Sequence, residues 1–197
     1  MPNYNDTRFG VPAPGYSDRI NHQDLLKAAK KQKKAGRIFG VILILLPILG
    51  FFLYSQITGE METMDALKYG GIISAVFLVV NLISAVSHAA KKSYEGEVIG
   101  KTARRINDDE HGSYDEFTTV VRRTDGSKTK IKERSTGTTF AWDYLQEGDR
   151  FLFHPELGFP YEKYNKASSP VLYCPVCARQ NPVTGDRCEK CGAPLLK

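Results

Sequence analysis

Two long stretches of the chain carry no charged side chain. Residues 38–59 and 69–90 contain no Asp, Glu, Lys or Arg, and each has 15 hydrophobic residues among its 22. About 20 helical residues cross a hydrocarbon core of ~30 Å, so both stretches are long enough to span a membrane. The pattern predicts transmembrane helices over 38–58 and 69–90, joined by a short extracytoplasmic loop over 59–68.

Small and polar side chains distinguish the second predicted span. Gly70 and Ser74 are four residues apart, a spacing that lets two membrane helices approach closely. Asn81 lies near mid-span, where its amide needs a hydrogen-bonding partner. These three residues form the predicted helix contact, either with the first span or with a second copy of the chain in a homo-oligomer.

Basic residues flank both predicted spans and give their orientation. The loop over 59–68 is acidic, whereas Lys91 and Lys92 follow the second span. Cytoplasmic flanks are enriched in Lys and Arg, so the pattern predicts a two-span cell-membrane protein with both termini in the cytoplasm. A basic cluster at the membrane surface precedes the first span and comprises Lys27, Lys30, Lys31, Lys33, Lys34 and Arg37.

This cluster also accounts for the overall charge. The chain of 197 residues has a net charge of +5 and a mean hydropathy of −0.32, values typical of a soluble basic protein. Residues 1–37 alone carry +5, so we do not take the net charge as a sign of nucleic-acid binding. We expect a disordered tail over 1–21 and a basic juxtamembrane helix over 22–36, with Gly36 marking a break before the span.

Short β-branched runs and turns replace the helical pattern after the second span. Asp125-Gly126 predicts a hairpin turn, and five or six strands in about 70 residues predict a small all-β barrel of SH3-like or OB-like kind over 94–166. The predicted strands are 97–102, 116–124, 128–134, 138–145, 150–154 and 161–164. The predicted core is Val98, Phe117, Val120, Ile131, Phe140, Trp142, Leu145, Phe151 and Phe153.

The four cysteines provide the most specific chemical signal. Cys174 and Cys177 form one C-x2-C pair, and Cys188 and Cys191 form a second pair ten residues later. Two such pairs can bring four thiolates onto one tetrahedral Zn²⁺. The set leaves no open coordination position, so we expect one structural zinc per chain; the ligands alone leave iron open. Disulfides are disfavoured because a cytoplasmic location keeps thiols reduced.

The residues around these cysteines carry a resemblance. YCPVCARQNPVTGDRCEKCGAPL, residues 173–195, resembles the short bacterial zinc-ribbon domain, which implies a zinc ribbon over 170–197 with the four cysteines as ligands. Ala178 departs from that family, which usually has Gly at this position. The whole layout, a two-span hairpin with a small barrel and a terminal ribbon, resembles uncharacterised bacterial membrane proteins.

The sequence favours a binding protein over an enzyme. It contains no nucleophile elbow, P-loop, zinc-protease motif or dinucleotide fingerprint, so no catalytic residue is predicted. We expect a membrane-anchored, cytoplasm-facing adaptor that contacts membrane lipid and a protein partner. The alternatives are a membrane-tethered ribbon that binds nucleic acid, for which the charge is a weak footprint, and an accessory subunit of a membrane complex.

Overall fold

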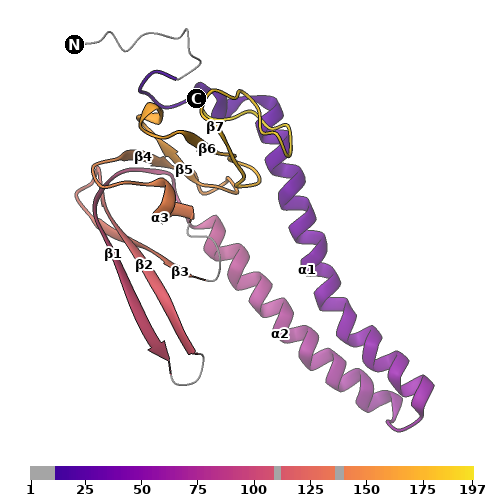
Figure 1. Cartoon of the computed structure of the whole chain (residues 1–197). Helices are drawn as coiled ribbons and strands as arrows, with labels where there is room; N and C mark the ends of the chain where they lie inside the picture. The colour runs from indigo at the N-terminus through magenta and orange to yellow at the C-terminus, as the bar shows by residue number, and fades with distance from the viewer. Residues whose placement is uncertain (1–11, 109–111, 136–139) are drawn as a thin grey trace, which may run out of the picture. The chain divides into compact units, whose positions relative to one another are not determined.

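The computed structural model describes residues 12–108, 112–135 and 140–197 (Figure 1). The chain divides into two compact units. One unit is the helical hairpin over Lys30–Lys91, and the other combines the chain up to Ala29 with Lys92–Lys197.

The hairpin consists of two long helices, α1 (Gln23–Thr58) and α2 (Thr63–Ala89). The expected juxtamembrane helix and first span are one continuous helix, so the predicted break at Gly36 is not present. The connection between the helices is also shorter than expected, because 63–68 belong to α2. The short acidic segment can start a helix, since Asp65 lies in the first turn and pairs with Lys68 at 2.8 Å.

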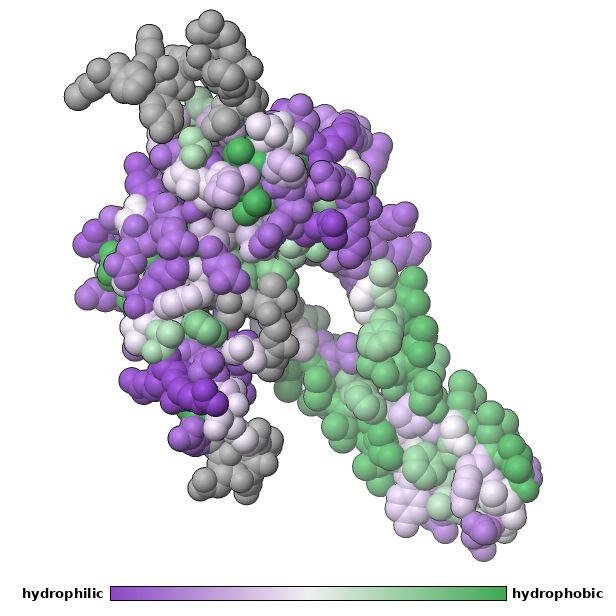
Figure 2. All heavy atoms as spheres, in the orientation of Figure 1, coloured by the Kyte–Doolittle hydropathy of each residue, from purple (hydrophilic) through white to green (hydrophobic). Residues whose placement is uncertain are grey.

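Both helices are long and apolar enough to cross a membrane. Only 11% of the most apolar window of each helix is buried inside the protein, which is unlike the core helix of a soluble protein. Hydrophobic side chains therefore cover the outside of the hairpin (Figure 2). Such a surface is stable in contact with lipid and costly in water.

The three predicted contact residues of α2 all lie against α1. The Ser74 hydroxyl donates a hydrogen bond to the Ile44 carbonyl at 2.5 Å. A Cβ atom on Gly70 would lie 2.9 Å from the Ile48 Cα, so only glycine allows this approach of the two backbones. The Asn81 side chain packs against Gly40 of α1 and donates a hydrogen bond to the carbonyl of Phe77 within α2 at 2.8 Å. Small and polar residues thus hold the hairpin together at close range.

The β-rich part of the second unit is an antiparallel five-stranded sheet. Its strands are β1 (Tyr94–Asp108), β2 (Gly112–Arg123), β3 (Lys128–Arg134), β4 (Arg150–Phe153) and β5 (Tyr161–Lys163). They follow the order β3-β2-β1-β4-β5. Within the described residues the edge strands β3 and β5 do not pair with each other. The sheet is therefore open, and the predicted barrel closure is not seen.

One predicted strand is wrong. Residues 140–144 of the expected strand over 138–145 form the short helix α3 (Phe140–Tyr144), and 138–139 lie outside the described residues. Glu133 of β3 explains the change, because its carboxylate accepts hydrogen bonds from the amides of Ala141 and Trp142 at 3.0 and 2.8 Å. This cap satisfies two amides that begin the helix, and a tertiary contact therefore overrides the strand propensity of the segment.

One face of the sheet forms the core with α3 and the ring of Tyr173. Val98, Leu145 and Phe151 are buried as predicted, and Ile131 and Phe153 pack against them. The predictions for Val120 and Phe140 are wrong. Val121 is fully buried in place of Val120, which lies on the opposite face, and Phe140 is 37% exposed. Val120 and Val121 are adjacent, so the sequence alone does not show which of the two valines faces the core. Phe117 and Trp142 pack on each other with ring centroids 5.1 Å apart.

The N-terminal segment is not disordered over its whole predicted length. Residues 1–11 lie outside the described residues, but 12–22 follow a defined path that includes a short 3₁₀ helix, η2 (Asp18–Asn21). The Gly15 amide donates a hydrogen bond to the Tyr164 carbonyl at 2.8 Å. The Tyr16 hydroxyl donates to the Glu95 carboxylate, also at 2.8 Å. This segment is thus ordered by contacts with residues more than 70 positions away in the sequence. Such contacts cannot be predicted from the composition of the segment itself.

A buried ionic network holds the same segment in place. Glu162 is 2% exposed and accepts hydrogen bonds from the Ser17 amide at 2.6 Å and the His154 ring at 2.9 Å. The fully buried ammonium of Lys166, in the short helix η3 (Lys166–Ser168), lies 2.9 Å from the same carboxylate and donates to the Gly15 carbonyl at 2.5 Å. Burial works to raise the pKa of Glu162, but the His154 hydrogen bond and the Lys166 charge outweigh it and lower that pKa.

We predict that Glu162→Gln destabilises the protein by about 3–5 kcal/mol, because it leaves the Lys166 ammonium buried without a counter-ion. A carboxyl pKa lowered by folding also stabilises the fold above its ordinary value of 4.5 and loses this effect as the pH falls through the folded-state value. Urea unfolding of the detergent-solubilised chain between about pH 3 and pH 7, a range that covers the titration of carboxyl groups, measures the effect of the substitution and the effect of pH.

Glu116→Gln is the matched control. Glu116 pairs at 3.2 Å with Lys132, whose side chain is 58% exposed, and exposed pairs contribute only about 0–1 kcal/mol. Equal destabilisation by the two variants would show that the buried network has no special role.

Candidate metal centre

The C-terminal segment folds around its two cysteine pairs. The strands β6 (Val171–Tyr173) and β7 (Gln180–Pro182) form a small hairpin, and Cys174 follows directly after β6. The second pair lies in a loop whose ends meet at the bridge between Arg187 and Pro194. The pairing of β6 with β7 places the first pair in the turn between these two strands.

The four cysteine sulfurs lie together. The Sγ atoms of Cys174 and Cys191 are 3.6 Å apart, as are those of Cys177 and Cys188, and all four lie within 4.8 Å of one another. Four sulfurs at ~2.3 Å from one tetrahedral metal ion would be about 3.8 Å apart. The arrangement therefore fits one metal ion, as the spacing predicted, and the four thiols would fill its coordination sphere.

The two cysteine pairs have the same backbone geometry. In the first, the Ala178 amide donates to the Cys174 carbonyl at 3.0 Å; in the second, the Gly192 amide donates to the Cys188 carbonyl at 2.8 Å. Ala178 and Gly192 both have positive φ, 56° and 70°. Among the described residues Ala178 is the only non-glycine residue in this conformation. The departure from the ribbon pattern noted in the sequence is thus a position where glycine fits better.

The sequence does not identify Asn181 as a link between the two cysteine pairs. Its side chain is 2% exposed and joins the two halves of the ribbon. The Oδ1 atom accepts a hydrogen bond from the Glu189 amide at 3.0 Å, and the Nδ2 atom donates to the Arg179 carbonyl at 2.7 Å. The Arg179 carbonyl lies just after the first cysteine pair, and the Glu189 amide lies within the second. Asn181 therefore fixes the two pairs relative to each other.

Backbone amides favour thiolate at part of the site. Burial works to raise the pKa of Cys188, but hydrogen bonds from the amides of Cys191 and Lys190 outweigh it, and the pKa falls to about 7. Burial dominates at Cys174 and raises its pKa. A metal ion binds the thiolate form of cysteine. Because burial disfavours the thiolate of Cys174, the positive charge of the metal ion must offset that cost.

The cysteine cluster is part of a hydrophobic core that extends beyond the ribbon. Cys174 and Cys188 share this core with Leu25 of α1, which is fully buried, and with Leu172 and Leu195. Two ion pairs reinforce the contact. Arg187 lies 3.0 Å from Asp24, and Arg19 lies 3.2 Å from Asp186. The start of α1 is therefore attached to the metal centre.

The segment that carries the cysteines also packs against the sheet domain, and the backbones of the two parts are in direct contact. The amides of Gly158 and Phe159 both donate to the Pro175 carbonyl, at 2.8 and 3.1 Å. A Cβ atom on Gly158 would lie 2.1 Å from the Val176 carbonyl oxygen. The predicted boundary between a barrel at 166 and a ribbon at 170 thus separates parts that fold against each other.

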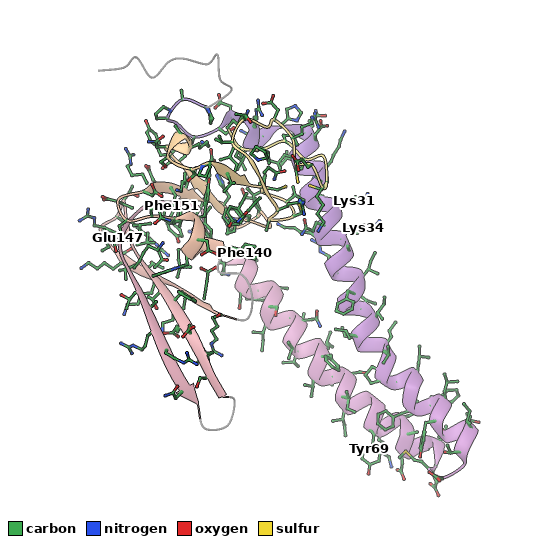
Figure 3. All side chains as sticks on the ribbon, viewed as in Figure 1. Lys31, Lys34, Tyr69, Phe140, Glu147 and Phe151 are labelled. Atoms are coloured by element: carbon green, nitrogen blue, oxygen red, sulfur yellow. The ribbon has the colours of Figure 1, made fainter. Side chains whose placement is uncertain are left out.

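The predicted basic cluster is spread along one exposed stretch of helix. Lys27, Lys30, Lys31, Lys33, Lys34 and Arg37 are all exposed residues of α1. Lys31 and Lys34 project from that helix in Figure 3. The cluster directly precedes the apolar part of α1 along the helix.

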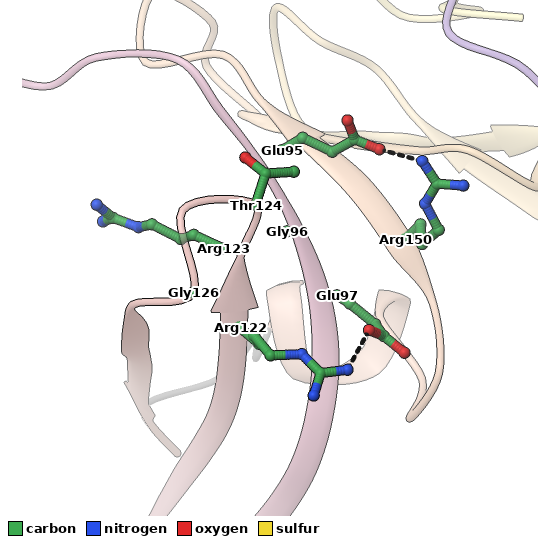
Figure 4. A pocket seen from close by; sticks show the side chains of 8 residues that line it. All are labelled: Glu95, Gly96, Glu97, Arg122, Arg123, Thr124, Gly126 and Arg150. Carbon is green, nitrogen blue, oxygen red and sulfur yellow. Dashed lines mark hydrogen bonds and ion pairs between the residues drawn. The ribbon is translucent and has the colours of Figure 1, made fainter.

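A shallow cleft of about 320 Å³ lies where β1, β2 and β4 meet (Figure 4). Both of its carboxylates are paired with arginines. Glu95 pairs with Arg150 at 2.6 Å, and Glu97 pairs with Arg122 at 2.7 Å. The guanidinium of Arg123 stacks over the Tyr94 ring at 4.1 Å. The cleft has no arrangement of acid, base and nucleophile that would point to a reaction.

Comparison of the chain with protein-family models, with curated proteins and with solved structures gave no match. The assignment of the metal centre therefore rests on the positions of the four thiols.

We predict opposite effects of exchanging the residues that follow the two cysteine pairs. Ala178→Gly removes a left-handed conformation that costs a non-glycine residue roughly 1–2 kcal/mol, and Gly192→Ala introduces one. Because metal binding is coupled to folding of the ribbon, the first variant should bind Zn²⁺ several-fold more tightly and the second several-fold more weakly. Competition of the full-length protein with a chromophoric chelator measures both. Shifts in the same direction would show that φ does not determine affinity.

Proposed function

We propose that this chain is a membrane-anchored adaptor, in which a helical hairpin holds a zinc-stabilised module at the cytoplasmic face of the membrane for binding another protein. The observation that carries the proposal is the closed set of four thiols. A metal with four protein ligands has no position for substrate or water, so its role is structural.

The apolar hairpin supports the anchoring part of the proposal. Its outer surface is hydrophobic, and basic residues lie at the two ends that lead to the termini. The positive-inside tendency then favours two spans with both termini in the cytoplasm. Four free thiols also fit this side, because the cytoplasm keeps cysteines reduced.

The charges of the ribbon favour a protein partner over nucleic acid. Arg187 pairs with Asp24, and Lys197 pairs with Asp186 at 3.3 Å. Two of the four cations of the ribbon are thus engaged within the protein. A surface for the phosphate backbone needs several cations on one face, and residues 170–197 offer few.

The orientation can be tested with single cysteines in the full-length protein in intact cells. We expect Glu62→Cys, between the two helices, to react with a membrane-impermeant maleimide, and Lys34→Cys to react only after the membrane is permeabilised. The unmodified protein, with its four native thiols, is the control and should not react in intact cells. Labelling of Lys34→Cys from outside would contradict the proposed topology.

The adaptor function can be tested by crosslinking and affinity capture from native membranes. The full-length protein should bind zinc at one ion per chain and capture a partner in stoichiometric amount. Cys177→Ser combined with Cys188→Ser should lose both the metal and the partner, because the module then lacks half its ligands. Glu60→Gln, in the turn of the hairpin, is the control and should retain both. Equal capture by the cysteine variant would refute a role for the metal-stabilised module.

A further inference from the structure

The sheet has an outer face, opposite the core, that none of the preceding sections assigns. In antiparallel strands, residues directly opposite each other project to the same side. The register pairs Arg122 with Lys128, Val120 with Lys130, and Thr118 with Lys132. It pairs Glu116 with both Arg134 and Arg104. These residues therefore share one face, while Val121 and Ile131 point to the core.

Basic side chains dominate this outer face on β1, β2 and β3. Six cations stand there against three carboxylates of the described residues, Glu95, Glu97 and Glu116, the first of which pairs with Arg150 of β4. The cations are exposed without exception: Arg104, Arg122, Lys128, Lys130, Lys132 and Arg134. Six cations and three carboxylates give this face of β1, β2 and β3 a net charge of +3, although residues 91–197 as a whole carry only +2.

Four of these cations have no acidic partner in the described part of the chain. Arg122 and Lys132 pair with Glu97 and Glu116, whereas Arg134 stacks over Tyr114 at 4.9 Å. Arg104, Lys128 and Lys130 make no ion pair among the described residues. Exposed cations gathered on one face form a site for a surface with many negative charges.

The tether of the sheet brings one such surface within reach. Four residues, 90–93, connect the end of α2 at Ala89 to the start of β1 at Tyr94. Four extended residues span at most about 14 Å, and two of them, Lys91 and Lys92, are themselves basic. Glu97, which pairs with Arg122 beside Lys128, is only three residues into β1. The basic face therefore begins close to the chain's exit from the apolar helix.

We infer that the outer face of β1, β2 and β3 binds the anionic phospholipid headgroups of the membrane in which the hairpin is anchored. The attraction between basic residues and an anionic leaflet acts over about a Debye length, ~8–10 Å at physiological salt. The four-residue tether, at most about 14 Å long, is only a little longer than that range, so it can bring the basic face to the membrane surface. This inference rests on the anchoring part of the proposed function and adds a lipid-binding surface to it.

Two other roles of the face give different expectations. Lysines on an edge strand also prevent pairing with another sheet, and β3 is an edge strand. That role gives no dependence on lipid charge. A face that binds nucleic acid would be occupied by an oligonucleotide whatever the lipid composition.

The test is lysine footprinting of the full chain in nanodiscs of neutral phosphatidylcholine or of phosphatidylcholine with phosphatidylglycerol. Co-purification of the chain with the discs is measured first, so a failure of anchoring is recognised separately. We expect acetylation of Lys128 and Lys130 to be at least about threefold slower in anionic discs than in neutral discs. High salt should abolish the difference, since it screens exposed charges. Lys190, exposed on the ribbon, is the internal control and should change little.

A variant tests whether charge causes the protection. Lys128→Glu combined with Lys130→Glu should remove the lipid dependence at Lys132, while Lys190→Glu should leave it unchanged. Equal acetylation of Lys128 and Lys130 in both kinds of disc would overturn the inference. Protection of these lysines by a single-stranded oligonucleotide in neutral discs, without protection by anionic lipid, would overturn it in favour of nucleic acid.

Discussion

The unit outside the helical hairpin depends on the placement of four thiols around one metal-sized site. The ribbon over 170–197 is too short to bury a core of its own, and the cysteines lie at the centre of the core it has. Cys174 and Cys188 contact a cluster to which Leu25, from the other end of the chain, contributes a fully buried side chain. Metal binding would therefore stabilise the ribbon and the start of α1 together.

The N-terminal segment is held at two places that reinforce each other. Leu25 inserts into the core around the cysteines, and Gly15 and Ser17 bind the buried network of Glu162 and Lys166. The chain passes between this unit and the helical hairpin at Ala29 and again at Lys92. Both ends of the hairpin therefore continue into the same compact unit, and these contacts fix the N-terminal segment within it.

The sequence predicts features that depend on local pattern and misses those that depend on distant contacts. Charge-free length predicts both apolar helices, and cysteine spacing predicts the thiol cluster, because each signal lies within one continuous segment. The order of residues 12–22 could not be predicted, since Tyr16 and Ser17 find their partners at Glu95 and Glu162. The helix at 140–144 depends on Glu133 in the same way. The strand count could not predict closure, which depends on whether the edge strands meet.

Hydrogen exchange of the full-length protein in detergent, with Zn²⁺ bound and after its removal by a chelator, tests the central claim directly. If the thiol cluster organises the core, loss of the metal should accelerate exchange of the amides of residues 25–28 together with those of 172–195, by about tenfold or more. The amides of the apolar segment, 44–54, should be unaffected and serve as the internal reference. Unchanged protection of 25–28 without metal would contradict the account.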